Sequence, residues 1–468
     1  MRARLLLVTL LGAAVLATAV APAAQAGERG AARQLERLRG DTAALSAFLR
    51  AMPKGTDLHT HLSGAVYAES IVRWGAADGQ CVDTFTLSSS YPPCAVGQVP
   101  LAQALSDQDL YQRIIAAWSM RGFAPGEESG HDHFFNTFDK LGSAFSQHKG
   151  DGVAEVAQRA AVQHVQYVEP LITPQFGATS KVAARTTYTR DFAALRDRLL
   201  AGGLLDALPA VRADIDATVA QQRAALGCDT PRPLAGCRTR VGFDVQVLRG
   251  QAPVVVFAQL LFGFALMADD PRWVGMNMVQ PEDGSIALRD YRLQMRMIAF
   301  LRPLYPSGKV TLHAGELAPG VAPPDDLRFH VREAVDVAKA DRIGHGVDLR
   351  GERDPAGILR TMRQRGTCIE INLTSNRQIL GVFGKAHPLR TYLKAGVPVT
   401  LSTDDEGVER TDLTEQYVIA AQEQGMTYPQ LKRAAENGLR CSFLPAGDKR
   451  AALREQAAAF TAFERRWR

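Results

Sequence analysis

The stretch Asp57-Leu58-His59-Thr60-His61-Leu62-Ser63-Gly64 decides the fold, because it joins a strand to metal-binding chemistry. It lies on an apolar segment after a Pro-Lys-Gly turn, which favours a β-strand. Side chains alternate between the faces of a strand, so His59 and His61 point to the same side. Two adjacent imidazoles at a strand end form half of a metal site. Two histidines that contact water or a carboxylate give the same pattern, so the remaining ligands must come from elsewhere in the chain.

Four later clusters of polar residues also follow apolar runs. They are His313-Ala314-Gly315-Glu316, Arg342-Ile343-Gly344-His345-Gly346, Asn372-Leu373-Thr374-Ser375-Asn376 and Ser402-Thr403-Asp404-Asp405. Three imidazoles and one carboxylate suit Zn²⁺ and leave a position for water. Capping of the last helix would explain one aspartate of the Asp-Asp pair at most.

Two further groups are placed for proton transfer at this site. A zinc-bound water is acidified toward neutrality, and its attack needs a proton acceptor and a proton donor. His345 and Glu316 suit these roles, while one of Asp404 and Asp405 binds metal and the other holds the nucleophile or the substrate. A single zinc ion per chain is expected, because the lysine that bridges two metals in many barrel hydrolases is missing between residues 181 and 309.

The distribution of apolar runs predicts an α/β fold, a (β/α)₈ TIM barrel. Seven runs separated by helical patterns follow the first strand, and the reactive residues recur at the carboxyl ends of these runs along the whole chain. That spread disfavours the alternative, a doubly wound sheet. The runs are Val162 to Leu171, Arg240 to Leu248, Trp273 to Met278, Lys309 to His313, Arg342 to Gly346, Cys368 to Leu373 and Val397 to Ser402.

Three other segments are predicted around this barrel. Ala31 to Met52 has helical spacing and is expected to be a short N-terminal helix. Residues of about 75–110 are rich in Gly, Ser, Pro and Cys and are expected to form an irregular insertion after the first strand. His131 and His133 repeat the H-x-H pattern among phenylalanines in a helical or loop setting, which favours structural or lid residues over metal ligands.

The first residues resemble a secretory signal peptide. Arg2 and Arg4 precede the apolar run Leu5 to Ala21, and Ala24-Gln25-Ala26 offers a cleavage site. The alternative, a membrane anchor, is disfavoured because the run is short and breaks at Pro22. We therefore expect a signal peptide over 1–26 and one domain over 27–468, secreted or periplasmic and without a membrane contact. The mild positive charge does not favour nucleic-acid binding, and the sequence has no basic helix or arginine-rich tract that would favour it.

Six cysteines in an exported chain favour disulfides. Cys81 and Cys94 flank one polar loop, and Cys228 and Cys237 flank another, so these two local pairs are predicted. Cys368 and Cys441 lie in apolar contexts and are predicted to be buried and reduced.

Taken together, these segments resemble the adenosine deaminase family. Met52-Pro53-Lys54-Gly55, His59-Thr60-His61, His313 to Glu316, Ile343 to Gly346 and Ser402 to Asp405 are similar to the signature segments of that family, in the same order. The resemblance implies a (β/α)₈ barrel that hydrolyses the 6-amino group of adenosine or 2′-deoxyadenosine. The leader, the Met-Pro-Lys-Gly segment and the cysteine-bearing insertion look most like the secreted, growth-factor-type branch.

The resemblance also implies roles for individual residues. His59, His61, His313 and Asp404 would bind zinc, and Glu316 would protonate purine N1 as water attacks C6. His345 would position and deprotonate that water, and Asp405 would bond the attacking oxygen and purine N7. Animal members dimerise through a longer N-terminal extension, which is shortened here, so the oligomeric state is not implied.

Two positions depart from the family pattern and concern the substrate. Ser63 stands where cytosolic members have an aspartate that meets the 5′ hydroxyl of the sugar. Gln280 stands where a glycine usually offers its backbone amide to purine N3. These two residues are the candidate substrate contacts, together with Asp405. They motivate the alternative of another amino-purine or modified nucleoside as substrate, and a catalytically idle binding protein is the alternative of a different class.

Overall fold

The computed structural model describes residues 22–174 and 176–467. Most of the predicted signal peptide lies outside these residues, and the predicted cleavage point after Ala26 falls within helix α1 (Pro22–Leu38). The helix predicted from Ala31 to Met52 is two helices, α1 and α2 (Thr42–Arg50). They separate at Asp41, whose carboxylate accepts a hydrogen bond from the Ala44 N–H and so caps the start of α2.

Within the described residues, eight parallel strands form a closed barrel, which confirms the predicted fold. They hydrogen-bond in two sheets of orders β1-β5-β7-β8 and β9-β10-β11-β12. The bridges Thr60–Asp404 and Met276–Val310 join the sheets at both seams and close the ring. The strands are β1 (Gly55–His61), β5 (Val165–Ile172), β7 (Phe243–Leu248), β8 (Trp273–Val279), β9 (Thr311–Ala314), β10 (Arg342–His345), β11 (Cys368–Ile371) and β12 (Val399–Leu401), with the short β6 (Arg240–Val241) beside β5.

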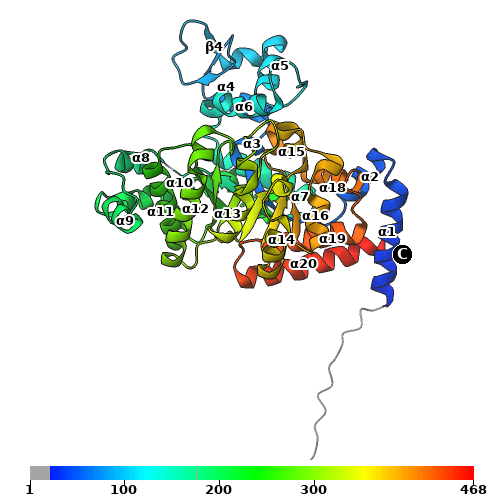
Figure 1. Cartoon of the computed structure of the whole chain (residues 1–468). Coiled ribbons are helices and arrows are strands. Elements are labelled where there is room, and N and C mark those ends of the chain that lie inside the picture. Colours follow the sequence, from blue (N-terminus) through cyan, green and yellow to red (C-terminus); the bar gives the residue numbers. More distant parts are fainter. Residues whose placement is uncertain (1–21, 175, 468) are drawn as a thin grey trace, which may run out of the picture.

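Helices surround the barrel in the alternating order of the predicted units (Figure 1). Helix α13 begins only at His330, because Phe329 before it leaves helical dihedrals (φ −153°). Of the described helices, none combines the length and apolarity needed to cross a membrane. The helices around the barrel are α7 (Lys149–Val162), α8 (Phe176–Ala184), α9 (Phe192–Ala201), α10 (Leu208–Ala225), α11 (Pro253–Asp269), α12 (Ser285–Leu301), α13 (His330–Asp336), α14 (Pro355–Arg365), α15 (Leu373–Leu380), α16 (Leu389–Ala395), α17 (Glu406–Glu409), α18 (Leu413–Gln422), α19 (Tyr428–Cys441) and α20 (Ala446–Arg465).

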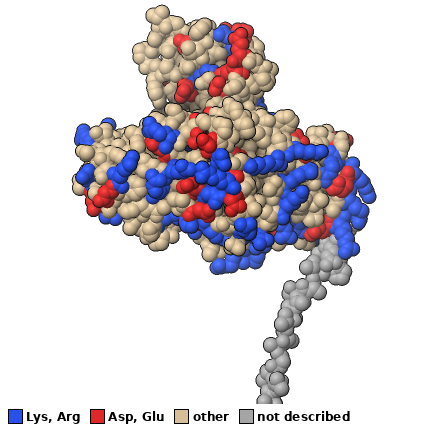
Figure 2. Space-filling model, in the orientation of Figure 1, with Lys and Arg blue, Asp and Glu red and all other residues tan. Residues whose placement is uncertain are grey.

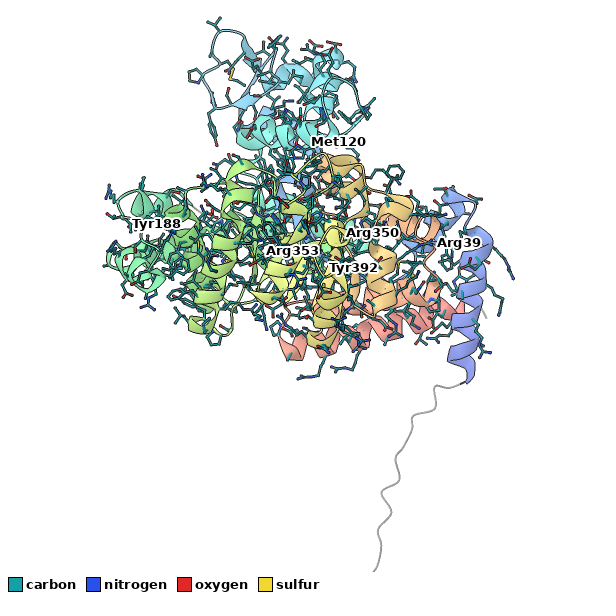
Figure 3. The ribbon with its side chains drawn as sticks, in the orientation of Figure 1. Arg39, Met120, Tyr188, Arg350, Arg353 and Tyr392 are labelled. Atoms are coloured by element: carbon teal, nitrogen blue, oxygen red, sulfur yellow. A yellow bond between two sulfur atoms is a disulfide. The ribbon has the colours of Figure 1, made fainter. Side chains whose placement is uncertain are left out.

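The insertion after the first strand forms a separate lobe above the barrel (Figure 1). Few charged side chains appear on it in Figure 2, whereas the barrel below is densely charged. Met120, labelled in Figure 3 where the lobe meets the barrel, donates its N–H to Val408 O at 2.7 Å. The lobe comprises α4 (Ala68–Ala77), β2 (Cys81–Asp83), β3 (Ser89–Ser90), β4 (Gln98–Pro100), α5 (Gln108–Ala117) and α6 (Gly130–Phe145), and α3 (Leu62–Ala65) connects it to β1.

All six cysteines are paired, which corrects one prediction. The local pairs Cys81–Cys94 and Cys228–Cys237 are present as predicted. Cys368 and Cys441, predicted to be reduced, form a third disulfide with their Cα atoms 6.3 Å apart. Cys368 begins β11 and Cys441 ends α19, so the barrel brings together two residues that lie 73 positions apart in sequence.

Thiol titration of the oxidised protein in denaturant is expected to find no free thiol. The physical reason is that each cysteine already has a partner within disulfide geometry. Two thiols per chain, mapped by alkylation and peptide mass to Cys368 and Cys441, would instead restore the pairing expected from sequence.

Candidate active site

Four side chains predicted as metal ligands converge at the carboxyl ends of the strands. Nε2 of His313 lies 3.1 Å from Nε2 of both His59 and His61. Oδ1 of Asp404 lies 3.5 Å from Nε2 of His59 and 3.3 Å from that of His61. These residues come from β1, from β9 and from the end of β12, and all four are buried.

The outer nitrogen of each histidine contacts an oxygen, which fixes its tautomer. Nδ1 of His59 lies 2.8 Å from Glu370 Oε2, and Nδ1 of His61 lies 3.3 Å from Gln246 Oε1. Nδ1 of His313 lies 2.9 Å from Asn277 Oδ1, which also accepts the His313 backbone N–H. Each Nδ1–H therefore donates, which leaves the three Nε2 atoms, turned toward one another, as the atoms that would bind a metal.

This arrangement fits a bound zinc ion. Nitrogen atoms so close together need a proton or a metal ion between them, because their lone pairs repel one another. A regular tetrahedron with edges of about 3.3 Å has its centre about 2.0 Å from each corner, which matches zinc–nitrogen and zinc–oxygen distances in proteins. The oxygen acceptors behind the histidines are the partners that orient zinc ligands in general.

Glu316 lies on the turn after β9, held by a buried carboxylate. Glu282 accepts the backbone N–H groups of Gly315 (3.0 Å) and Glu316 (2.8 Å) and contacts His330 Nδ1 at 2.6 Å. Burial, with Asp404 and Glu282 nearby, raises the pKa of Glu316 well above its usual range. A carboxyl group in this environment keeps its proton at neutral pH and can donate it.

His345 and Asp405 lie beside the ligands. Nε2 of His345 is 3.6 Å from Asp404 Oδ2, and its Nδ1 is 3.6 Å from Glu316 Oε1. Tyr392, labelled in Figure 3, donates its hydroxyl to Gly346 O and so fixes the turn that follows His345. Burial lowers the pKa of His345 to about 3, so the ring is neutral. Burial and Asp404 raise the pKa of Asp405.

A cavity of about 430 Å³ opens above these groups. Its walls come from the strand ends and from one face of α6, so the lobe completes the pocket. It is lined by both departures from the family pattern, Ser63 and Gln280, and by Glu316 and Asp405. The other lining residues are His61, Phe134, Phe135, Asn136, Phe138, Asp139, Gln246, Leu248, Val279, Pro281, His313 and Asp404.

Gln280 has the backbone conformation of a glycine. Its φ is +80°, a backbone angle that residues other than glycine rarely adopt. Its side-chain Oε1 accepts the N–H of Gly250 at 2.9 Å. The side chain is therefore tied to the rim of the barrel, and the main chain keeps the left-handed turn.

The second H-x-H pair lies on α6, apart from the metal ligands. His131 contacts Asp283 (3.1 Å) and Asp132, and His133 contacts Glu128 at 2.8 Å. Neither belongs to the ligand group found among the described residues. The structure places both on the helix that forms one wall of the cavity.

Several supporting residues were missed by the sequence analysis. Glu370, Asn277 and Gln246 orient the histidine ligands, and Glu282 holds the Glu316 turn. Glu370 and Asn277 could have been predicted, because each is a polar residue inside an apolar strand, in Cys-Ile-Glu-Ile and in Met-Asn-Met. A buried polar group needs a hydrogen-bond partner, so such a residue indicates a polar contact in the core.

Comparisons with known proteins point in one direction. Residues 292–459 match the family model for adenosine deaminase. An adenosine deaminase from Escherichia coli strain SE11 is 38% identical over 151 residues, which are 32% of this chain and 42% of that protein. A second, from strain S88, matches to the same extent. The match thus spans less than half the length of these curated relatives.

Solved structures resemble the fold over most of the chain. An amidohydrolase from Burkholderia ambifaria with bound Zn has a TM-score of 0.55 at 18% identity, covering 90% of this chain and 94% of that one. An N6-mAMP deaminase from Arabidopsis has a TM-score of 0.56 at 17% identity, covering 88% and 99%. An adenine deaminase from Arthrobacter aurescens has a TM-score of 0.52 at 16% identity, covering 87% and 98%. At these identities the likeness supports the fold alone.

Proposed function

We propose that the chain is a member of the adenosine deaminase family and a zinc-dependent aminohydrolase of adenosine and 2′-deoxyadenosine; the match of residues 292–459 to the family model supports this. Its products are inosine or 2′-deoxyinosine and ammonia. The observation that supports this most strongly is the convergence of three imidazole nitrogens, the Asp404 carboxylate and the buried Glu316 carboxyl group, whose pKa is raised, beside one cavity. One zinc ion per chain, held by the four ligands, would acidify the attacking water.

The residues around the cavity divide the remaining work. Glu316 donates its proton to purine N1, which makes C6 electrophilic. Asp405 bonds the attacking oxygen and purine N7, and His345 holds the water against C6. The backbone of Gln280 faces the purine, and Ser63 lies where the sugar enters.

The chemistry of the cavity wall favours an uncharged nucleoside over a nucleotide. Among the described residues that line the cavity, none is lysine or arginine. A phosphate group carries up to two negative charges, and proteins usually bind it through such cations. The second candidate function keeps the chemistry and changes the substrate to another amino-purine or a modified nucleoside, which Ser63 and Gln280 motivate.

We also propose that the protein acts outside the cytosol. Three disulfides support this proposal, together with the leader sequence, because such bonds persist in oxidising compartments. Recovery of the processed chain from the medium or periplasm, with its amino terminus read by mass, would test it.

Absorbance assays with zinc-loaded protein test the proposed function. We expect metal-dependent loss of the adenosine band, fastest for adenosine and 2′-deoxyadenosine in a panel with adenine, AMP and modified nucleosides. Faster turnover of another member of the panel would establish the second candidate. No turnover of any member, with zinc bound, would identify an idle binding protein.

Gln280→Gly is expected to leave kcat/KM for adenosine within a factor of about three. The substitution removes one hydrogen bond, a loss of about 0.5–1.5 kcal/mol, and it relieves a left-handed residue that costs about 1–2 kcal/mol. Steady-state kinetics and thermal unfolding measure the two effects. A tenfold fall in KM would show instead that the glutamine side chain obstructs the pocket.

A further inference from the structure

His387 is buried next to the site, although neither the ligand set nor the cavity includes it. Its Nδ1 accepts the backbone N–H of Leu389 at 3.1 Å, and its Nε2 lies 3.0 Å from Asn376 Oδ1. Burial lowers the pKa of His387 to about 3, so the ring is neutral. A neutral ring that accepts at Nδ1 has its proton on Nε2. His387 therefore donates to Asn376.

The hydrogen bond from His387 fixes the orientation of the Asn376 amide toward His345. With its oxygen occupied by His387, the amide directs Nδ2 at His345 Nδ1, 2.9 Å away. Reversing the amide would place its NH₂ group against the Nε2–H of His387. His387 cannot move that proton to Nδ1, because the Leu389 N–H already points there. One main-chain N–H thus sets the direction of the whole chain of hydrogen bonds.

We propose that Asn376 and His387 are positioning residues that hold His345 in the Nε2–H tautomer, so that His345 donates a hydrogen bond to the attacking water. Within the function proposed above, this removes His345 as acceptor of the proton from that water. Nε2 of His345 faces the ligand side, 3.6 Å from Asp404 Oδ2. Two other groups lie near the ring, both farther away than Asn376 Nδ2 at 2.9 Å. Glu316 Oε1 is 3.6 Å from Nδ1, and Asn372 Nδ2 is 3.5 Å from Nδ1 and 3.4 Å from Nε2.

With zinc bound, the water would already have lost its proton to solvent before it attacks, because the metal acidifies it toward neutrality. In the attack an electron pair of that oxygen forms the bond to C6, the O–H bond of Glu316 breaks, and its proton neutralises the charge that develops on N1. Oδ1 of Asp405 is buried and has no hydrogen-bond partner among the described residues, so it is free to contact the attacking oxygen.

Two near-isosteric variants separate donation from packing. Glutamine at 387 keeps an N–H for Asn376 Oδ1, whereas leucine of similar size does not. The zinc-loaded full-length chain, labelled with ¹⁵N-histidine, reports the tautomer of each ring through two-bond ¹H–¹⁵N correlations, and His345→Gln identifies the His345 signals. We expect Nε2–H in the wild type and in His387→Gln. We expect His387→Leu to shift His345 toward Nδ1–H.

Kinetics should follow the tautomer. His387→Leu is expected to lower kcat by about 10²-fold, the effect of losing one preorganised donor, with KM nearly unchanged and with His387→Gln close to wild type. Asn376→Asp presents an acceptor to Nδ1 and should convert His345 fully to Nδ1–H. His148→Gln, which alters a half-buried histidine bonded to Asp78 and Asp151 outside the cavity lining, is the control.

An Nδ1–H ring at His345 in the wild type would overturn the proposal, and so would an unchanged tautomer in both His387→Leu and Asn376→Asp. The tautomer is read without substrate. Failure of the proposed function, seen as no turnover of any purine, therefore remains distinct from failure of this inference.

Discussion

Replacing Glu316 by glutamine is expected to lower kcat by about 10²–10⁴-fold without loss of zinc or of folding. Glutamine keeps the shape of the side chain and removes the proton that the purine ring must receive. The backbone of this residue is held by Glu282 through its own N–H, so the turn survives the change. Turnover by absorbance, zinc by mass spectrometry and thermal unfolding together measure the three quantities. A loss smaller than tenfold would exclude Glu316 as the proton donor.

The pH profile provides a second test of the same carboxyl group. Burial raises the pKa of Glu316, and the protonated form is the active one, so kcat/KM of the wild type should fall as the pH rises through that pKa. Residual activity of Glu316→Gln should lack this fall. The matched control is Glu333→Gln on α13, which should keep the wild-type profile, since Glu333 pairs with Arg292 away from the cavity.

Arg342→Met is expected to lower the free energy of unfolding by about 3–5 kcal/mol, the cost of leaving buried charges unpaired. The Arg342 guanidinium is buried beneath the metal ligands and pairs with Glu169 at 2.6 Å and with Glu370. Burial, with Glu169 nearby, raises the pKa of Asp244, whose Oδ2 lies 3.4 Å from Nη2 of Arg342. The charges of Glu169 and Glu370 would then face no cation.

Denaturant unfolding of the zinc-free protein measures this loss, and the zinc-free state removes any contribution from metal binding. Arg342→Lys is the matched variant, because lysine keeps the positive charge but cannot contact Glu169 and Glu370 with separate N–H groups of a planar guanidinium. Its unfolding midpoint should lie between those of the wild type and Arg342→Met. Equal midpoints for all three proteins would show that the cluster contributes nothing to stability. We also expect weaker zinc binding in Arg342→Met, because Glu370 supports His59.

The sequence was sufficient for the barrel and for the grouping of the ligands. His59, His61, His313 and Asp404 are recognisable because each sits in a short local pattern where an apolar run ends, and parallel strands place such ends at one edge. The two local disulfides were predictable for a related reason, since each pair flanks one short loop.

Contacts between distant segments were not predictable in this way. Cys368 and Cys441 pair because the start of β11 and the end of α19 meet at the amino ends of the strands. Their apolar sequence context alone had predicted reduced thiols. Asn376 was read as part of a strand-end cluster, but its partner His387 lies on a separate segment. The direction of a hydrogen-bond chain depends on atoms that no residue pattern specifies. The growth-factor-type likeness remains a prediction.

The seam between β1 and β12 has a consequence for how the protein is made. During synthesis His59 is added early and Asp404 some hundreds of residues later. The bridge between Thr60 and Asp404, which closes the barrel, can form only after Asp404 has been added. A nascent chain that stops before β12 has the three histidines of the ligand group and an unpaired sheet edge. It lacks Asp404, the fourth residue of that group. Binding of the proposed zinc ion would therefore be completed only late in synthesis, when the first and last strands of the barrel meet.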